Sequence, residues 1–309
     1  MKTLFLTEGG RDIGLGHIMR SMALSQGFKE KGIDSSFIVN GDSSVIDFLS
    51  KEQYWIFDWI KEKDRLFNEV RKNNIIVIDS YLADKELYEE ISEIAGGQLL
   101  MIDDYNRIKY PKGVVVNPSI SGESLDYPKA SGVKSLVGKD YIILRREFWD
   151  VSPKKINKKV KNVLITFGGK DHSYLINEII EYLNSRFNFN FTVVNPWENK
   201  LIALQMLGLM LKADICVSAG GQTLNELARV GVPTIGVCMA DNQERNLEAW
   251  QEQGFLKFVG GYNDQHFMDN IELAIKEMIS LPVRQKMLDV AKSCIDGQGV
   301  QRIAEHIIN

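Results

Sequence analysis

The sequence predicts an α/β fold made of two doubly wound parallel-sheet domains. Short apolar runs of strand length alternate along the chain with longer segments whose apolar residues recur at helical spacing, which is typical of repeated strand–helix units. Strands that are apolar throughout indicate a parallel sheet covered by helices on both faces. The chain has 309 residues, of which 44% are hydrophobic, so it is long enough to form two domains with real cores.

The apolar runs place the expected strands. They cover residues 3–7, 35–40, 74–79, 98–103 and 113–118 in the first half, and residues 163–167, 190–194, 214–218, 233–238 and 255–260 in the second. The first expected helix covers residues 17–32, where Met19 and Ala23 are four residues apart and Gly32 ends the helix. The same alternation restarts after the middle of the chain, so each half is expected to form its own sheet.

A basic, turn-rich segment at residues 152–162 separates the two halves. We interpret it as a solvated linker between an N-terminal domain of residues 1–150 and a C-terminal domain of residues 151–309. Ligands of doubly wound sheets bind at the carboxyl ends of the strands, so two such domains facing each other would hold a site in their cleft. The stretch around residues 195–205 is short, so the second domain either lacks one strand–helix unit or has lost a loop.

The composition argues against several classes of partner. The 37 basic and 41 acidic residues give a net charge of −4, which disfavours nucleic acid and anionic membrane. No apolar run is long enough to span a membrane, and the apolar stretch within the first residues is too short for a secretion signal. The three cysteines are widely spaced, and no His/Cys cluster has the spacing of a metal site. We expect a cytoplasmic protein without metal or cofactor.

The loop after the first expected strand has the composition of an anion site. Gly9, Gly10, Gly14 and Gly16 precede a helix that starts near His17. Glycines let the backbone approach a ligand, and the free N–H groups of a helix start favour a phosphate. Neither the dinucleotide-binding nor the ATP-binding spacing of glycines is present. His17 is therefore either a base beside the bound anion or a residue that hydrogen-bonds the loop.

Two later helix starts also offer polar groups that could bind a ligand. The first offers small side chains, hydroxyls and N–H donors from Ser218, Gly220, Gly221, Gln222 and Thr223. Glu226, one turn further on, either accepts hydrogen bonds from a sugar diol or simply favours the helix dipole. At the second helix start, Asn242 and Gln243 can bind a neutral polar ligand, or one residue of this loop caps the helix.

Two further candidates lie at strand ends in the first half. Asp79 and Tyr81 follow one strand, and Asp103 and Asp104 follow the next. Tandem aspartates point in different directions on a strand, so the second pair does not indicate a metal site.

Seven motifs follow one another along nearly the whole chain: IGLGHIMR, IDSY, MIDD, YIILRREF, FGGKD, SAGGQTLNELA and DNQERNLEAW. This series resembles the UDP-sugar hydrolases of pseudaminic acid biosynthesis, the PseG family, and related proteins of spore-coat polysaccharide synthesis. The resemblance implies a GT-B architecture, in which two Rossmann-like domains enclose a nucleotide-sugar cleft, and no metal. The form DSYL at residues 79–82 departs from the DHYG-like form associated with the family, which puts the sugar specificity in doubt.

The resemblance also implies roles for individual residues. His17 matches the catalytic base, Tyr81 a tyrosine near the reacting sugar, and Glu226 the acid that holds the ribose of UDP. Asn242 matches an asparagine of the site, and residues 220–223 match the diphosphate loop. The residues expected to bind nucleotide or substrate are Gly14, Gly16, Gly168, Gly169, Ser218, Gly220, Gly221, Gln222, Thr223, Glu226, Asn242 and Gln243.

The activity that the resemblance implies is hydrolysis of a UDP-linked, 2,4-diacetamido-type sugar to free sugar and UDP without a metal. His17 would take a proton from the water that attacks C1, so we expect it not to pair with a carboxylate that keeps it charged, and Asp12 is the neighbour to examine. A GT-B glycosyltransferase with a UDP-sugar donor is an alternative that uses the same fold. A non-catalytic nucleotide-sugar-binding subunit, which would not need His17, is a second.

Overall fold

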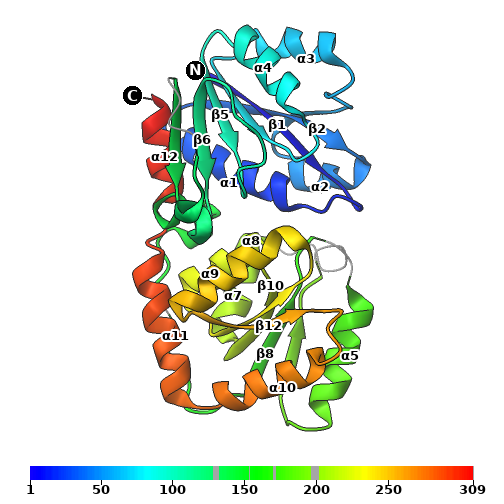
Figure 1. The fold of residues 1–309 in the computed structure, drawn as a ribbon, viewed down its shortest axis with the longest axis vertical. Helices are drawn as coiled ribbons and strands as arrows, with labels where there is room; N and C mark the ends of the chain where they lie inside the picture. Colours follow the sequence, from blue (N-terminus) through cyan, green and yellow to red (C-terminus); the bar gives the residue numbers. More distant parts are fainter. Residues whose placement is uncertain (128–131, 153, 170–171, 196–201, 309) are drawn as a thin grey trace. The chain divides into compact units, whose positions relative to one another are not determined.

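The chain divides into two compact units, each built around one parallel sheet (Figure 1). The computed structural model describes residues 1–127, 132–152, 154–169, 172–195 and 202–308. Unit 1 contains Met1–Arg146 together with Gln298–Asn309, and unit 2 contains Glu147–Gly297. The division after Arg146 lies close to the expected boundary after residue 150. The last residues of the chain, which the sequence places in the second domain, lie in unit 1 instead.

The sheet of unit 1 has the strand order β3-β2-β1-β4-β5-β6-β7, and every neighbouring pair is parallel. Its strands are β1 (Lys2–Gly9), β2 (Asp34–Gly41), β3 (Gln53–Ile56), β4 (Ile75–Asp79), β5 (Gln98–Ile102), β6 (Gly113–Asn117) and β7 (Val133–Val137). The order reverses between β1 and β4, and such a switch point is where doubly wound sheets bind their ligands.

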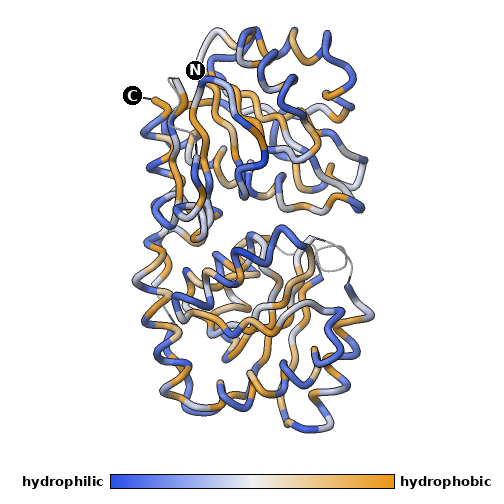
Figure 2. Tube along the Cα trace, viewed as in Figure 1, coloured by the Kyte–Doolittle hydropathy of each residue, from blue (hydrophilic) through white to orange (hydrophobic). Residues whose placement is uncertain are grey.

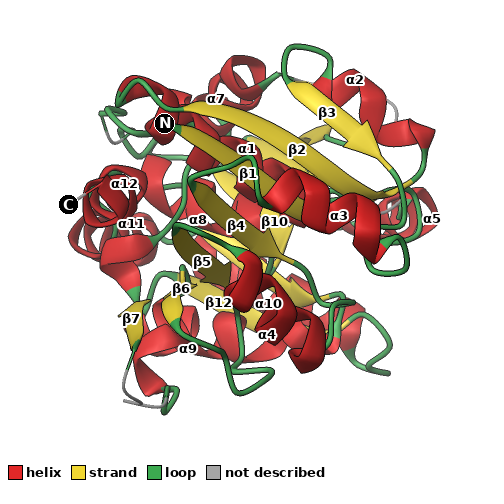
Figure 3. Cartoon of the chain, turned by 90° about the horizontal axis from the view of Figure 1, so that it is seen from above, coloured by secondary structure: helices red, strands yellow, loops and turns green. Residues whose placement is uncertain are grey.

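Helices cover both faces of this sheet (Figure 3). They are α1 (Gly16–Glu30), α2 (Ile46–Leu49), α3 (Lys63–Val70), α4 (Lys85–Ile94) and α12 (Gly299–Ile308), with 3-10 turns η1 (Ser43–Val45), η2 (Ile120–Ser124) and η3 (Lys139–Tyr141). Successive side chains of a strand point to opposite faces. Leu4 and Leu6 therefore share a core with α3 and α4, whereas Phe5 packs against Phe28 of α1.

The described part of unit 2 contains a second parallel sheet, with the order β12-β11-β10-β8-β9. Its strands are β8 (Asn162–Thr166), β9 (Asn190–Val193), β10 (Ile215–Ala219), β11 (Thr234–Cys238) and β12 (Leu256–Gly261). Its helices are α5 (Ser173–Asn184), α7 (Ala203–Lys212), α8 (Gln222–Val230), α9 (Glu244–Gln253), α10 (Phe267–Met278) and α11 (Leu281–Cys294), with turns η4 (Arg146–Phe148) and η5 (Asp241–Gln243). In both units the apolar residues concentrate in the strands (Figure 2).

The expected fold class is confirmed, because all ten predicted strands are present and parallel. The two strands that the sequence analysis did not predict, β3 and β7, form the two edges of the first sheet. Within the described residues of unit 2, β9 is an edge strand and the chain continues towards α7. Residues 196–201 lie outside the described residues, so the loss of a strand–helix unit around 195–205 stays a prediction.

The basic segment at residues 152–162 is not a solvated linker throughout, and that interpretation is wrong for Lys154. Lys154 is 7% exposed, and its ammonium donates to the carbonyl of Ala213, the residue that ends α7. The last carbonyls of a helix need donors, and this buried lysine supplies one. Burial lowers the pKa of Lys154 to about 8, although Asp214 opposes the shift. The segment therefore packs as part of unit 2.

We predict that Gly41→Ala destabilises unit 1 by about 2 kcal/mol or more. A Cβ at Gly41 would lie 1.9 Å from the backbone oxygen of Gly9, so β1 and β2 would have to separate at their carboxyl ends. Urea unfolding measures the loss. Gly96→Ala in the same unit is the matched control, since a Cβ there meets nothing within 4 Å. Equal stabilities of the two variants would contradict the prediction.

Candidate active site

Acidic residues gather where three adjacent strands of unit 1 end. Glu8 lies near the end of β1, Asp79 ends β4, and Asp104 follows β5. The strands are parallel neighbours in the order β1-β4-β5, with Thr7 paired with Asp79. Their carboxyl ends therefore meet at one edge, which is the edge where α1 begins.

The turn between β1 and α1 is closed by its glycines. Gly10 and Gly14 exchange two backbone hydrogen bonds of 3.1 and 2.7 Å, and their φ values are 155° and 94°. A Cβ at Gly10 would lie 2.4 Å from the Asp42 carboxylate, which itself accepts a hydrogen bond from the Arg11 N–H. Glycine is thus required for the close approach, and the tight turn directs the first turn of α1 over the strand ends.

The first turn of α1 carries both His17 and Arg20. The helix begins at Gly16, and no side chain caps its first N–H groups. Residues three apart lie on the same face of a helix, so the imidazole and the guanidinium both reach the end of β4. The glycine-rich turn and the open helix start together agree with the expected anion site, and the role of Gly14 and Gly16 in binding stays a prediction.

Asp79 bonds both side chains. Nδ1 of His17 lies 2.7 Å from Oδ1 of Asp79, and Arg20 donates to the same carboxylate from Nε at 2.9 Å and from a terminal nitrogen at 2.6 Å. Asp79 is 1% exposed and Arg20 is 7% exposed. Burial by itself raises the pKa of Asp79, but Arg20 and His17 outweigh it and hold that pKa well below its usual range.

The protonation of His17 differs from what the sequence suggests. The neighbouring carboxylate is Asp79 rather than Asp12, and the expectation that His17 avoids such a partner is wrong. Burial lowers the pKa of His17, but the charge and hydrogen bond of Asp79 more than offset it, so the pKa lies above 6.5. When Nδ1–H donates to Asp79, Nε2 is left as the acceptor on the opposite side of the ring.

Glu8 is the second carboxylate near His17. Its Oε1 lies 3.8 Å from Nε2 of His17 and accepts the backbone N–H of Tyr81 at 2.9 Å. Its Oε2 accepts the hydroxyl of Ser80 and the backbone N–H of Leu82. Glu8 thus fixes the loop that carries Tyr81, and its negative charge contributes to the raised pKa of His17.

Tyr81 closes a ring of side chains around this edge. Its ring stands edge-on to His17, with centroids 4.4 Å apart, and its hydroxyl donates to Asp104. Asp104 in turn accepts from Arg20 at 2.6 Å. His17, Asp79, Arg20, Asp104 and Tyr81 thus form a closed circuit. The structure brings the candidates His17, Asp79, Tyr81 and Asp104 together, and it adds Arg20 and Glu8 to them.

Some of these additions had a sequence signal. The spacing of His17 and Arg20 already places them on one helix face. Glu8 is the polar residue that follows an apolar strand, which is a common position for functional groups in parallel sheets. The pairings themselves join residues 59 and 84 positions apart, so no local pattern reveals them.

The predicted nucleotide residues of unit 2 also gather at one sheet edge. Gly168 follows β8, Gly220 follows β10 and Asn242 follows β11, and these three strands are neighbours. Gly168 has a φ of 82°. The two residues after Gly169 lie outside the described part of the chain. The start of α8 at Gln222 has Gly221 as its N-cap and no side-chain cap, and the positive end of a helix favours an anion.

Other predicted residues of unit 2 have structural partners. Gln243 accepts the backbone N–H groups of Gly220 at 3.3 Å and Met239 at 3.2 Å, which ties two loops together. The buried Ser218 donates to the carbonyl of Ala219. Glu226 is 1% exposed, whereas Asn242 is exposed. Contact of these residues with a nucleotide stays a prediction.

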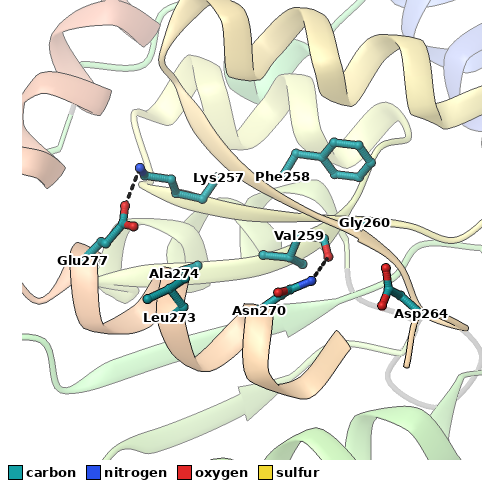
Figure 4. A pocket seen from close by; sticks show the side chains of 9 residues that line it. All are labelled: Lys257, Phe258, Val259, Gly260, Asp264, Asn270, Leu273, Ala274 and Glu277. Carbon is teal, nitrogen blue, oxygen red and sulfur yellow. Dashed lines mark hydrogen bonds and ion pairs between the residues drawn. The ribbon is translucent and has the colours of Figure 1, made fainter. Parts of the chain in front are cut away.

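A separate hollow of unit 2 gathers none of the predicted residues. It has a volume of about 360 Å³ and lies between the edge strand β12 and α10 (Figure 4). Lys257 and Glu277 form an ion pair across it, and Asn270 donates to the carbonyl of Val259. Because none of the predicted site residues lines this hollow, it is not the candidate active site.

The described residues contain neither a metal-binding cluster nor a membrane-spanning helix. No group of three or more His, Cys, Asp or Glu side chains in this part of the chain is arranged to hold a metal ion. None of the described helices combines the length and apolar character needed to cross a membrane.

Comparison with known proteins identifies relatives. No protein-family model matches the chain. The spore coat polysaccharide biosynthesis protein SpsG of Bacillus subtilis is 23% identical, and the match covers 96% of this chain and 94% of that protein. The pseudaminic acid cytidylyltransferase and UDP-2,4-diacetamido-2,4,6-trideoxy-beta-L-altropyranose hydrolase of Helicobacter pylori is 24% identical over 82% of this chain and 46% of its own length. The resemblance to the PseG family is confirmed.

For two of the relatives, the match covers only about half of the relative's own length. An uncharacterized protein of Methanocaldococcus jannaschii is 25% identical over 76% of this chain, and the match covers 55% of that protein. The chain thus spans about half the length of this relative and of the Helicobacter pylori relative.

Solved structures share the fold at lower identity. MurG of Acinetobacter baumannii has a TM-score of 0.66 at 13% identity, covering 98% of this chain and 99% of that one. Arabidopsis thaliana UGT89C1 complexed with quercetin has a TM-score of 0.67 at 12% identity, covering 99% of both chains. The fold is GT-B-like, as the sequence predicts.

We predict that the His17 imidazole titrates above pH 6.5 and that of His306 below it. Asp79 stabilises the charged form of His17, whereas burial and Lys134 disfavour the charged form of His306. Side-chain NMR of the imidazoles as a function of pH measures both groups in one sample, with each signal assigned from a His→Asn variant. A His17 that titrates below His306 would contradict the geometry described here.

Proposed function

We propose that the chain is a hydrolase that cleaves a UDP-linked, 2,4-diacetamido-type amino sugar to free sugar and UDP without a metal ion. The observation that carries the proposal is the pair of His17 and Asp79 at the strand ends of unit 1, because this pair is built to activate a water. The names of the Helicobacter pylori and Bacillus subtilis relatives support a role in pseudaminic acid or surface polysaccharide biosynthesis. Unit 1 carries the base and unit 2 binds the UDP.

Asp79 fixes the tautomer that the base needs. With Nδ1–H donated to Asp79, Nε2 of His17 accepts the proton of the attacking water, and Asp79 and Glu8 stabilise the imidazolium that results. The raised pKa is the cost of this arrangement, since the imidazole must be neutral to accept a proton. The base is strong when it is neutral, and the neutral fraction of the imidazole grows as the pH rises.

The bond changes are those of a single displacement. Water attacks C1 of the sugar, a C–O bond forms as the C1–O bond to the diphosphate breaks, and the electron pair leaves with UDP. The positive end of α8 stabilises the charge that develops on the diphosphate. The proton that His17 has taken up then returns to solvent.

We predict that wild type releases UDP from the UDP-linked 2,4-diacetamido sugar with no acceptor and with EDTA present. His17→Asn is expected to lose about 10²–10⁴-fold in kcat, because general base catalysis contributes about that much, while calorimetry shows unchanged UDP affinity. His266→Asn, an exposed histidine of unit 2, is the matched control. An equal loss of UDP binding and turnover in His17→Asn would refute the base assignment. UDP binding without turnover in wild type would favour a glycosyltransferase or a binding subunit.

The pH dependence of kcat provides a further prediction. The rate is expected to rise with pH through the pKa of His17, which lies above 6.5, because only the neutral imidazole accepts a proton. Asp79→Asn removes the charge that raises this pKa, so the inflection moves to lower pH while the maximal rate falls. Rates measured from pH 5 to 9 show both effects. An inflection that stays in place in Asp79→Asn would mean that another group controls the rate.

A further inference from the structure

The hydroxyl of Tyr81 already donates its proton to Asp104 in the structure without a ligand. We propose that Asp104 is a positioning residue that holds this proton, so that Tyr81 accepts a hydrogen bond from a hydroxyl or amide N–H of the substrate's sugar. The inference rests on the proposed function and deepens it, because it states which chemical group of the sugar faces Tyr81.

Each oxygen of Asp104 is bound by one donor. Oδ1 accepts from Arg20 at 2.6 Å, and Oδ2 accepts from the Tyr81 hydroxyl. A carboxylate paired with an arginine has no proton to give, so the tyrosine must be the donor in this contact. A tyrosine hydroxyl has one proton and two lone pairs. Whatever group a substrate brings to this oxygen must therefore donate.

Arg20 keeps Asp104 where this contact requires it. The guanidinium uses Nε and one terminal nitrogen for Asp79 and the other terminal nitrogen for Asp104. The planar fork of arginine gives these three bonds fixed directions. Asp79 is buried at the end of β4 and fixes the guanidinium of Arg20. The guanidinium in turn fixes the position of Asp104.

Packing fixes the ring of Tyr81 as well. His17 meets one side of it edge-on at 4.4 Å, and Tyr105 packs against it with centroids 5.4 Å apart. The Tyr81 oxygen is thus held near the proposed base in a constant direction. A phosphate oxygen only accepts hydrogen bonds, so this tyrosine does not protonate the departing UDP. It binds the sugar.

The alternative role for Asp104 is to balance the charge of Arg20 without acting through Tyr81. The two roles differ in a double-mutant cycle. If Asp104 acts through the tyrosine hydroxyl, its removal has no further effect once that hydroxyl is gone. If it only balances charge, its removal costs the same in both backgrounds.

The experiment is calorimetric binding of UDP-2,4-diacetamido-2,4,6-trideoxy-β-L-altropyranose, and separately of UDP, in a His17→Asn background that prevents turnover. The variants added to this background are Tyr81→Phe, Asp104→Asn, the double variant, and Glu93→Gln as a control for loss of one exposed negative charge on unit 1. Each single site variant is expected to weaken binding of the UDP-sugar by about 3- to 10-fold, the value of one hydrogen bond. UDP binding and the Glu93→Gln control stay unchanged, and the double variant equals Tyr81→Phe.

Four outcomes would overturn the inference. An equal effect of Asp104→Asn with and without the Tyr81 hydroxyl would make it a charge-balancing residue. Weaker UDP binding together with a lower Tm would make it a purely structural one. UDP-sugar binding that is unaffected by Tyr81→Phe would place the sugar elsewhere, with the proposed function intact. If the background protein binds UDP but gains nothing from the sugar, and wild type does not hydrolyse the compound, both the proposed function and the inference fail.

Discussion

The buried ion pair between Arg20 and Asp79 is the interaction on which the rest of the candidate site depends. Both groups are nearly inaccessible to water, and a buried charge is tolerated only when a partner and hydrogen bonds replace its hydration. Removing one partner of such a pair typically costs about 3–5 kcal/mol. The pair joins the first turn of α1 to the end of β4, so it fixes the angle at which His17 approaches Asp79. The same guanidinium also binds Asp104, and Asp104 accepts a hydrogen bond from the Tyr81 hydroxyl.

The charged groups at this edge of the sheet shift the pKa of His17 in opposite directions. Asp79 and Glu8 make His17 a stronger base, and Arg20 limits the effect because its positive charge lowers the pKa of His17. Without Arg20, the pKa of His17 would be raised further, and less of the imidazole would be in the neutral form that accepts a proton. A histidine that contacts a carboxylate can therefore act as a base when a cation is paired with the same carboxylate. The sequence argument overlooked this, since it considered a carboxylate near His17 without a third group.

The sequence predicted the strands that helices cover on both faces, because such strands are apolar throughout and stand out from their surroundings. It missed β3 and β7, whose residues are mostly half-buried or exposed: β3 is only four residues long, and Lys134 and Ser135 interrupt the apolar run of β7. The edge strands β9 and β12 were predicted because their apolar runs are more continuous. In the site it named His17 and Tyr81 from the helix start and the resemblance, and Asp79 and Asp104 from their places at strand ends. Glu8, Arg20 and Asp104 take their roles from contacts between distant segments, and such contacts exist only in the folded chain. The burial of Lys154 was missed for the same reason, since its carbonyl partner lies 59 residues away.

Unit 1 is not a continuous stretch of sequence, and this matters for the site. The helix α12, from the end of the chain, packs against α1, and a Cβ at Gly27 would lie 2.2 Å from the Val300 side chain. Lys31 and Glu305 add an ion pair between the two helices. The helix that carries His17 and Arg20 thus has its first turn on the strand ends and part of its surface against the last helix. A domain cut from the sequence at the expected boundary would leave that surface of α1 exposed to water. The geometry of the candidate base therefore depends on residues nearly 300 positions away along the chain, and no motif around His17 can specify it alone.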